Sequence, residues 1–474
     1  MGCKIKTTRQ EYDLLGSKEI PAEAYYGIQT LRALENFPIT GSKPGKELIE
    51  AIAMVKKAAA LANRELGQLN AEIATAILQA ADEILAGQHH DQFIVDMIQG
   101  GAGTSLNMNA NEVIANRAIE ILGGEKGDYS LVSPNSHVNM AQSTNDVFPT
   151  AVRITILNLV KTLVANLKQL QEALLAKAKE FDLVIKMGRT HLQDAVPIRL
   201  GQEFGAYAES IRRDADRIET AAQALTQINM GATAVGTGLN ANLRYIKLVT
   251  DQLRQISGLP VFTSANMVDA TQNVDTLVAF SGSLKILALN LSKIANDLRL
   301  MSSGPRAGFN EINLPPVQPG SSIMPGKVNP VIAEVVNQVA FQVLGNDHTV
   351  ALAAEAGQFE LNVMEPVMVF NIIQSIEILS RVVKVFKEKC IIGITANSDR
   401  CRAMVDTSVG IITPLVPYVG YEEATKLAQE AMTSNKTIQE LIADKGILSE
   451  EQIKKILSPQ NMTEPATGTP ATRT

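Results

Sequence analysis

Two long segments of the sequence carry apolar residues at alternating spacings of four and three. Residues 150–180 contain neither glycine nor proline, and the pattern returns over residues 277–301, before a Gly-Pro pair at 304–305. Such spacings place the apolar side chains along one face of a helix, as in helical bundles and coiled coils. Charged residues do not flank these faces regularly, as a coiled coil would require. We therefore expect long helices buried in a bundle, formed between subunits.

Composition and further periodic segments also favour a mostly α protein. Aromatic residues make up only 4% of the chain and tryptophan is absent. Small and unbranched apolar residues pack helices together, whereas β-sandwiches depend more on aromatic and β-branched side chains. A little strand is expected near residues 37–40 and 230–240. Similar helical patterns occupy residues 47–65, 71–86, 105–121, 199–227, 328–356 and 364–391.

Breaks rich in Gly, Pro and Asn divide the chain into three expected domains. Residues 1–144 form an N-terminal, mixed but mainly helical domain, and residues 145–399 form the central domain of long helices. Residues 400–474 form a small C-terminal helical domain. Its tail, "TEPATGTPATRT", is polar and rich in Pro and Thr, so we expect it to be disordered. The central domain contains a long irregular stretch at 302–322, of a kind that is usually functional or mobile.

Charge, cysteine content and apolar runs exclude several classes of protein. The net charge is -6, from 43 basic and 49 acidic residues, without a dense Lys/Arg run, which argues against a nucleic-acid partner. The three cysteines, Cys3, Cys390 and Cys401, have neither metal-ligand spacing nor a disulfide framework, which suits a reducing cytoplasm. The first residues contain no secretory signal, and no uninterrupted apolar stretch is long enough to cross a bilayer. We expect a soluble, cytoplasmic protein with no membrane partner.

The segment "PGSSIMPGKVNP", residues 319–330, has the glycines, serines and Gly-Lys pair of a phosphate-binding loop. A P-loop requires four residues between its two glycines and a Ser or Thr after the lysine. Here five residues separate Gly320 from Gly326, and Val328 follows Lys327. Both requirements fail, so the segment needs another explanation.

Four stretches concentrate small hydroxyl, amide and glycine residues, and we expect them to lie beside helices. They are this segment, "GGAGTSLNMNANE" (100–112), "SHVNMAQSTNDVFPT" (136–150) and "MGRTHLQDAVP" (187–197). Each alone is explained equally well as a turn with a helix N-cap. Together they offer hydrogen-bond donors at helix N-termini, which bind carboxylates well, and Lys327 adds a positive charge. Since the chain lacks a cysteine nucleophile setting, a metal spacing such as HExxH and a Gly-x-Ser-x-Gly elbow, proton abstraction beside a carboxylate fits best.

"GSSIMPGKVNP" resembles the signature of the aspartase/fumarase superfamily, and the resemblance covers nearly the whole chain. It runs from "DLLGSKEIPAEAYYGIQTLRALENFPIT" through "GRTHLQDAVPIRLGQEF" to "SSGPRAGFNEINLP". Within the superfamily, "QGGAGTSLNMNANEVIANRA", "AVGTGLN" and "EAGQFELNVMEPV" are most similar to aspartate ammonia-lyases. Class II fumarases typically carry "GSGTQSNMN" in place of the first of these segments.

The resemblance implies a three-domain fold whose long central helices form a shared bundle in a homotetramer, with each active site built from three subunits. It further implies reversible deamination of L-aspartate to fumarate and ammonia without an organic cofactor, and we expect no metal site. Fumarate hydratase activity, interconverting fumarate and L-malate, remains the alternative. A non-catalytic assembly is a third hypothesis, although the signature side chains needed for chemistry are all present.

The resemblance also assigns site residues. Ser321 is the expected general base, activated by its surroundings, and His191 and Lys327 complete the predicted catalytic set. Glu334 is expected to orient His191 or Lys327. The ammonium group of the substrate would be accepted by the Asn145 carbonyl, by the Thr104 hydroxyl and by a neutral His191 nitrogen. The β-carboxylate and its enediolate form would bind Thr104, Ser143, Thr144 and Ser322, and the α-carboxylate would bind Thr190, Lys327 and Asn329.

Overall fold

The computed structural model describes residues 7–434 and 436–465, most of which are in helices. The predicted mostly α fold is therefore confirmed. The expectation for Cys3 and most of the predicted disordered tail, from residue 466 onward, lie outside the described residues.

The chain forms two compact units. Unit 1 comprises the chain up to residue 164 together with residues 216–286 and 342–379, and unit 2 comprises residues 165–215, 287–341 and 380 onward. The three domains expected from the order of the sequence stay a prediction.

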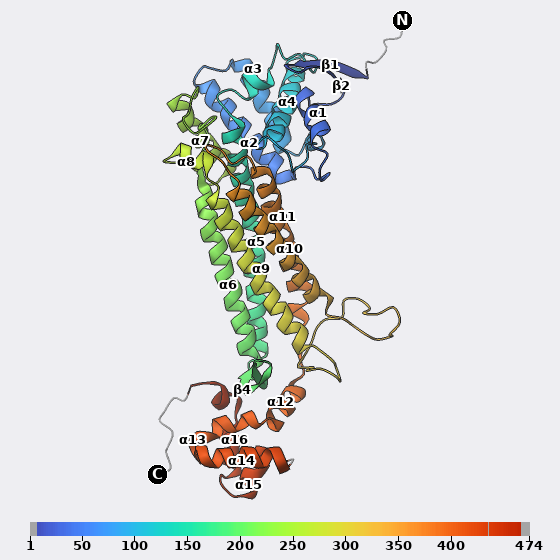
Figure 1. Ribbon diagram of the computed structural model, residues 1–474, viewed down its shortest axis with the longest axis vertical. Coiled ribbons are helices and arrows are strands. Elements are labelled where there is room, and N and C mark those ends of the chain that lie inside the picture. Colours follow the sequence, from blue (N-terminus) through green and yellow to red (C-terminus); the bar gives the residue numbers. More distant parts are fainter. Residues whose placement is uncertain (1–6, 435, 466–474) are drawn as a thin grey trace. The chain divides into compact units, whose positions relative to one another are not determined.

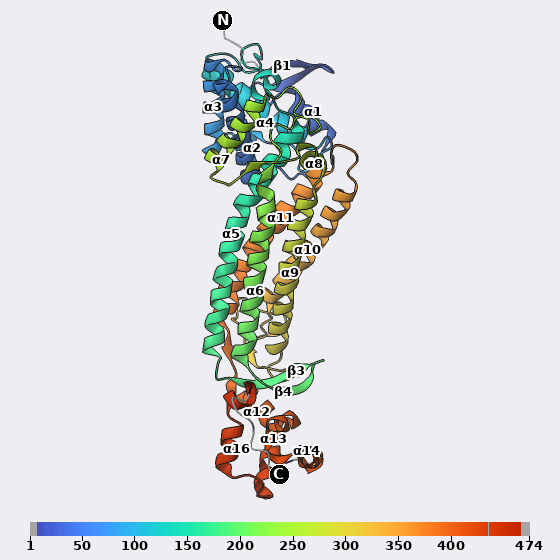
Figure 2. The same cartoon turned by 90° about the vertical axis from the view of Figure 1, so that its left-hand side faces the viewer.

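Five long helices contribute a segment to each unit, and within each unit these segments run side by side (Figures 1 and 2). The predicted apolar face of the first is buried, for example at Leu163 in unit 1 and Leu170 in unit 2. Side-chain hydrogen bonds join neighbouring helices, as between Asn290 and Asp214 in unit 2. The helices are α5 (Thr144–Glu180), α6 (Leu200–Gln223), α9 (Asp275–Met301), α10 (Val331–Glu355) and α11 (Glu365–Lys389).

Unit 1 also contains shorter helices, in which α2 packs against α3 and α7 (Figure 1). Small buried side chains on α2, such as Ala58 and Ala62, allow this close packing. The elements are β1 (Thr8–Asp13), β2 (Gly16–Pro21), α1 (Ile28–Asn36), α2 (Lys46–Glu65), α3 (Ala71–Leu85), α4 (Thr104–Ile121), β5 (Gln227–Ile228), α7 (Leu243–Ser257), β6 (Phe262–Thr263) and α8 (Met267–Gln272).

Unit 2 contains the C-terminal helices, which share an apolar core with one β-hairpin. Ile185 and Met187 of the hairpin pack with Leu415, Leu427 and Leu441. The elements are β3 (Ile185–Thr190), β4 (Gln193–Arg199), β7 (Ile312–Asn313), β8 (Thr395–Ala396), α12 (Ser398–Thr407), α13 (Val416–Val419), α14 (Tyr421–Ser434), α15 (Ile438–Asp444), α16 (Glu450–Ile456) and α17 (Pro459–Thr463).

The predicted strands were wrong. In the described part of the chain, residues 37–40 and 230–240 are turns and loops, and the four two-stranded sheets lie elsewhere. The helices α1, α7 and α8 were not predicted either. The helices α1 and α8 are short, with 9 and 6 residues. The helix α7 lies directly after a Gly- and Asn-rich segment, where Asn242 caps its first turn by accepting a hydrogen bond from the Arg244 N–H.

By length and composition alone, three helices among the described residues are apolar enough to cross a membrane, which differs from the sequence expectation. The expectation considered only uninterrupted apolar runs, whereas these helices alternate apolar and polar residues. In the apolar window of Thr144–Glu180, 78% is buried inside the chain, so packing accounts for its apolar character. The windows in Asp275–Met301 and Glu365–Gly393 are 50% and 56% buried, so they retain apolar surface.

Candidate active site

In unit 1, the first predicted stretch forms the start of α4. Gly103 has a φ of 94°, and a Cβ at this position would lie 2.4 Å from the ring of Phe148 on α5. Glycine therefore allows the close approach of α4 and α5. The Thr104 hydroxyl, which is exposed, donates a hydrogen bond to the Gly101 carbonyl oxygen at 2.6 Å. Because its one hydrogen is engaged, the Thr104 oxygen remains an acceptor, which suits an ammonium group better than a carboxylate.

The hydroxyl groups of Ser143 and Thr144, at the start of α5, accept hydrogen bonds, whereas that of Thr104 donates one. Ser143 Oγ accepts a hydrogen bond from the Asn145 N–H at 3.2 Å, and Thr144 Oγ1 accepts one from Asn107 Nδ2 at 3.1 Å. An amide N–H can only donate, so each hydroxyl keeps its own hydrogen for another partner. Ser143 and Thr144 can therefore each still donate one hydrogen bond. The bond from Asn107 also joins the two predicted stretches of unit 1, which lie far apart in the sequence.

A proline inside α5 changes the hydrogen-bond partners of Asn145. Pro149 has no N–H, so the Asn145 carbonyl oxygen lacks its helical partner and accepts from Asn229 Nδ2 at 3.0 Å instead. Asn145 Nδ2 donates to the Ala234 carbonyl oxygen at 2.7 Å. With its side-chain nitrogen engaged, Asn145 keeps Oδ1 as an acceptor, in keeping with the predicted contact to the substrate ammonium.

Asp146 anchors the same turn from within the core. Its buried carboxylate accepts hydrogen bonds from the N–H groups of Ser143, Gly231 and Thr233 at 3.0–3.1 Å. Burial raises the pKa of Asp146 to about 6, although these N–H groups oppose the shift. The sequence analysis did not select Asp146, although it lies within a quoted stretch.

In unit 2, Thr190 and His191 lie in a β-hairpin, which continues directly into α6 at Leu200. Thr190 ends β3 and pairs with Gln193 of β4, and both Thr190 and His191 are exposed. His191 and Leu192 form the turn with φ values of 57° and 59°. A left-handed turn without glycine is uncommon and strained, and such strain is concentrated at functional sites.

Two charged side chains anchor this hairpin. Buried Lys186 lies 3.0 Å from Glu203 and 2.9 Å from Glu311. Arg189 lies 2.8 Å from the other oxygen of Glu311 and stacks over the ring of Phe309. Because β3 is fixed to residues 309–311, the exposed turn is held on a rigid support.

The signature segment forms a loop in unit 2 whose two ends are joined by hydrogen bonds. The Gly320 N–H donates to the Lys327 carbonyl oxygen at 2.7 Å, and Asn329 Nδ2 donates to the Gly320 carbonyl oxygen at 2.7 Å. A Cβ on residue 320 would lie 2.7 Å from the Lys327 oxygen and 2.8 Å from the Asn329 nitrogen, so glycine is required here. Asn329 therefore has a structural role besides its predicted contact with the α-carboxylate.

The hydroxyl oxygen of Ser321 is the acceptor of two backbone hydrogen bonds. The N–H groups of Ile323 and Met324 donate to Ser321 Oγ at 3.2 and 3.0 Å. Two N–H dipoles directed at this oxygen favour its anionic form and so lower its proton affinity. The neighbouring Ser322 is exposed. Of the two serines, Ser321 therefore has the surroundings expected of a general base.

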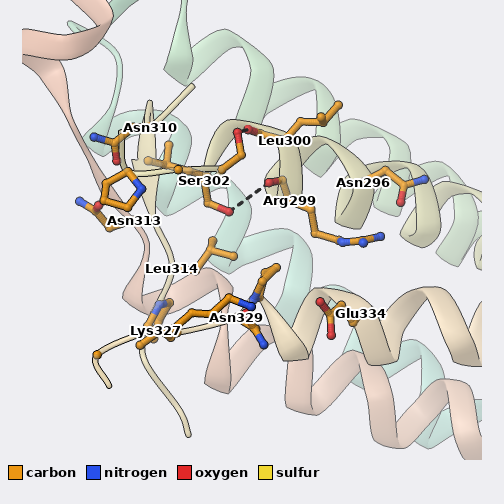
Figure 3. A pocket seen from close by; sticks show the side chains of 18 residues that line it. Asn296, Arg299, Leu300, Ser302, Asn310, Asn313, Leu314, Lys327, Asn329 and Glu334 are labelled. Carbon is orange, nitrogen blue, oxygen red and sulfur yellow. Dashed lines mark hydrogen bonds between the residues drawn. The ribbon is translucent and has the colours of Figure 1, made fainter. Parts of the chain in front are cut away.

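A pocket of about 880 Å³ adjoins this loop in unit 2 (Figure 3). Lys327, Asn329 and Glu334 line it from the loop and from α10, while Asn296 and Arg299 line it from α9. Ser321, Ser322, Thr190 and His191 are not among the described residues that line it.

The pocket also contains polar residues that the sequence analysis did not select. Asn310, Asn313, Ser302 and Ser303 belong to the irregular stretch that was considered functional or mobile, so their location was indicated but not their role. Arg299 lies on α9 among other polar and charged residues, such as Lys293 and Asp297, so nothing in the sequence distinguished it.

The structure thus divides the predicted residues between the two units. Unit 1 holds the hydrogen-bond donors of Ser143 and Thr144 with the acceptors of Thr104 and Asn145, and unit 2 holds the hairpin turn and the signature loop. Among residues 7–434 and 436–465, no three His, Cys, Asp or Glu side chains are grouped as a metal site.

Comparisons with known proteins give a consistent family. Residues 16–345 match the Lyase family and residues 411–464 match the Fumarase C C-terminus family. The chain is 60% identical to aspartate ammonia-lyase from a Bacillus species, over 96% of this chain and 98% of the relative. It is 51% identical to fumarate lyase:delta crystallin from Brucella melitensis bound to cobalt (TM-score 0.95, 97% and 100% covered).

A second solved structure, the class II fumarase from Schistosoma mansoni, is more distant. It shares 35% identity, with a TM-score of 0.91 and 95% and 98% of the two chains covered. The chain that carries these hydroxyl, amide and lysine groups matches these lyases over almost all of its length. The chain therefore belongs to the lyase family of the aspartase/fumarase superfamily.

Proposed function

We propose that the chain is a carbon–nitrogen lyase that converts L-aspartate reversibly to fumarate and ammonia. The observation that carries this function is the 60% identity to an aspartate ammonia-lyase over 96% of the chain, against 35% to a class II fumarase. The hydrogen-bonding state of the site residues adds support, because the chain offers acceptors for an ammonium group as well as donors for carboxylates.

In the proposed reaction, Ser321 as an alkoxide takes the proton from the carbon beside the β-carboxylate. The electron pair of that C–H bond moves into the β-carboxylate and gives a doubly charged enediolate. When this pair returns to form the C=C bond, the C–N bond breaks and ammonia leaves with the bonding electrons. The Ile323 and Met324 N–H groups support the alkoxide, since both already point at Ser321 Oγ.

The remaining side chains stabilise charge. Ser143 and Thr144, with Ser322, donate to the β-carboxylate, where negative charge increases along the reaction. Thr190, Lys327 and Asn329 bind the α-carboxylate. Asn145, Thr104 and neutral His191 accept from the ammonium, and Thr104 is placed here rather than on the β-carboxylate because its hydrogen is engaged by Gly101. Glu334 orients Lys327, with which it lines one pocket.

A direct assay distinguishes this reaction from the alternative. Purified protein supplied with L-aspartate should produce fumarate, measured by its ultraviolet absorbance, and should produce none from L-malate. Preparations from host cells lacking the chain control for contaminating enzymes. Fumarate formed from L-malate but not from L-aspartate would assign the chain to the hydratases.

We also propose that the protein is a cytoplasmic homotetramer with shared active sites. Apolar side chains remain exposed on the long helices, including Leu289 on α9 at 48% and Phe341 on α10 at 67%. Packing of these surfaces between copies would bury them, as in other helical bundles. The free, buried thiols of Cys390 and Cys401 suit a reducing compartment.

Sharing of the active site predicts complementation between two variants of low activity. Thr144→Val removes a donor of unit 1, and Ser321→Ala removes the base of unit 2. If each site combines these residues from different subunits, hybrids formed by co-expressing the two variants contain some intact sites and regain activity. Each variant mixed only with itself provides the control. Hybrids that form but remain inactive would contradict shared sites.

A further inference from the structure

Lys56 on α2 is a lysine with no exposed surface, at 0% of its accessible area. Its Nζ donates to Asn139 Oδ1 and to Gln142 Oε1, each at 2.9 Å. Both acceptors are neutral amide oxygens, so the ammonium has no carboxylate in direct hydrogen-bond contact among these partners. Burying a cation in this way costs stability, which apolar residues of similar size would not. A role in stability alone therefore does not explain why a lysine occupies this position.

The contacts of Lys56 continue to the proposed substrate site. Asn139 Oδ1 also accepts from Asn107 Nδ2 at 3.3 Å and from Asn111 Nδ2 at 3.2 Å. Asn107 Nδ2 in turn donates to Thr144 Oγ1 at 3.1 Å. All of these residues belong to unit 1. A chain of side-chain hydrogen bonds thus runs from Lys56 through Asn139 and Asn107 to Thr144.

The direction of this chain depends on how the Asn139 amide is held, by Lys56 on its oxygen and by the Gln142 carbonyl oxygen, which accepts from Asn139 Nδ2 at 3.1 Å. An asparagine amide can present either its oxygen or its nitrogen to a neighbour, whereas an ammonium can only donate. Lys56 therefore requires Asn139 to present Oδ1, and this oxygen in turn requires Asn107 to present its NH₂ group. Because that NH₂ group also faces Thr144, the Thr144 oxygen accepts and the hydroxyl hydrogen is left for the substrate.

We propose that Lys56 is a positioning residue that fixes the direction of this hydrogen-bond chain, so that the Thr144 hydroxyl donates to the substrate carboxylate. Without the lysine, Asn139 keeps the bond from its Nδ2 to the Gln142 carbonyl oxygen and its contacts with Asn107 and Asn111. Asn107 can then turn over, and the Thr144 hydrogen is drawn toward the Asn107 Oδ1 atom. The proposal rests on the proposed function, since it needs a carboxylate at Thr144. Burial lowers the pKa of Lys56 to about 7, opposed by the charge of Asp146. The ammonium form is the one that fixes the direction, because a neutral amine can also accept a hydrogen bond.

A double-mutant cycle tests whether Lys56 acts through Thr144. Lys56→Met removes the donor while keeping an unbranched side chain, and we expect kcat/KM for L-aspartate to fall by about tenfold to hundredfold, as misoriented groups do. In a Thr144→Val background, the same substitution should change kcat/KM by less than about twofold. Thermal unfolding should show Lys56→Met cooperatively folded but less stable than the parent protein, because the substitution leaves Gln142 Oε1 without this donor.

Lys57→Met provides a matched control, because Lys57 is the next residue of α2 and pairs with Asp82 instead. It should leave kcat/KM unchanged. Equal losses for Lys56→Met with and without the Thr144 hydroxyl would overturn the proposal, as would full activity of Lys56→Met. Should Lys56→Met not fold, Asn107→Ala replaces it in the same cycle, and additive effects there overturn the proposal too. A parent protein inactive on L-aspartate would instead overturn the proposed function.

Discussion

Replacing Ser321 with alanine is expected to lower kcat for L-aspartate by about 10³-fold or more, in the range that loss of a general base produces. The structure supplies the reason in the two N–H groups that point at Ser321 Oγ. These N–H groups stabilise the Ser321 alkoxide, and alanine has no oxygen to which they could donate. The fold should survive, because Ser321 is half-buried in a loop closed by backbone and side-chain bonds at Gly320.

Proton exchange isolates the step that Ser321 performs. In D₂O, the parent protein should exchange the proton beside the β-carboxylate of L-aspartate, whereas Ser321→Ala should exchange it no faster than buffer does. Ser322→Ala is the matched comparison and should mainly raise KM, since Ser322 is proposed to bind rather than to abstract the proton. Exchange retained in Ser321→Ala at the parent rate would assign the base to another residue.

The long helices could be predicted because their apolar spacing extends over many turns. Residues such as Leu163 and Leu170 are all buried on one face of the helix. The repeat therefore predicts a helix even where single polar residues interrupt it. The β3–β4 hairpin lacks such repetition, whereas α7 has it at Ile246, Val249 and Leu253 and was missed although its spacing is helical. In the hairpin, a charged residue, Lys186, occupies a buried position, because it forms ion pairs with Glu203 and Glu311. Nothing in the local sequence reveals partners that lie so far away.

The candidate site shows the same distinction. The residues predicted by resemblance lie in compact motifs, and the structure adds the hydrogen-bonding state of each one. That state depends on partners outside the motifs, as Thr144 depends on Asn107 and Asn145 depends on Asn229. Lys56 could not be predicted at all, since a lysine on an Ala-rich helix is ordinarily a solvated residue.

Lys327→Met is expected to lower kcat/KM for L-aspartate by about 10²-fold to 10³-fold. Lys327 is exposed and lines the pocket together with Asn329, so its ammonium is available to a ligand. A charge-assisted contact with the α-carboxylate is stronger than a neutral hydrogen bond. Methionine preserves the apolar stem but removes the charge, and the backbone bond between Gly320 and Lys327 is unaffected by the change.

Two inhibitors, one with two carboxylates and one with an ammonium group in place of the second, decide whether Lys327 binds the α-carboxylate. Succinate carries both carboxylates, whereas 3-aminopropanoate carries only the one equivalent to the β-carboxylate. Lys327→Met should weaken inhibition by succinate far more than inhibition by 3-aminopropanoate, because only succinate loses an ionic contact. Lys293→Met, on α9 where Lys293 pairs with Asp297, should change neither constant. Equal weakening of both inhibitors would place Lys327 at the β-carboxylate, or make its effect one of overall charge.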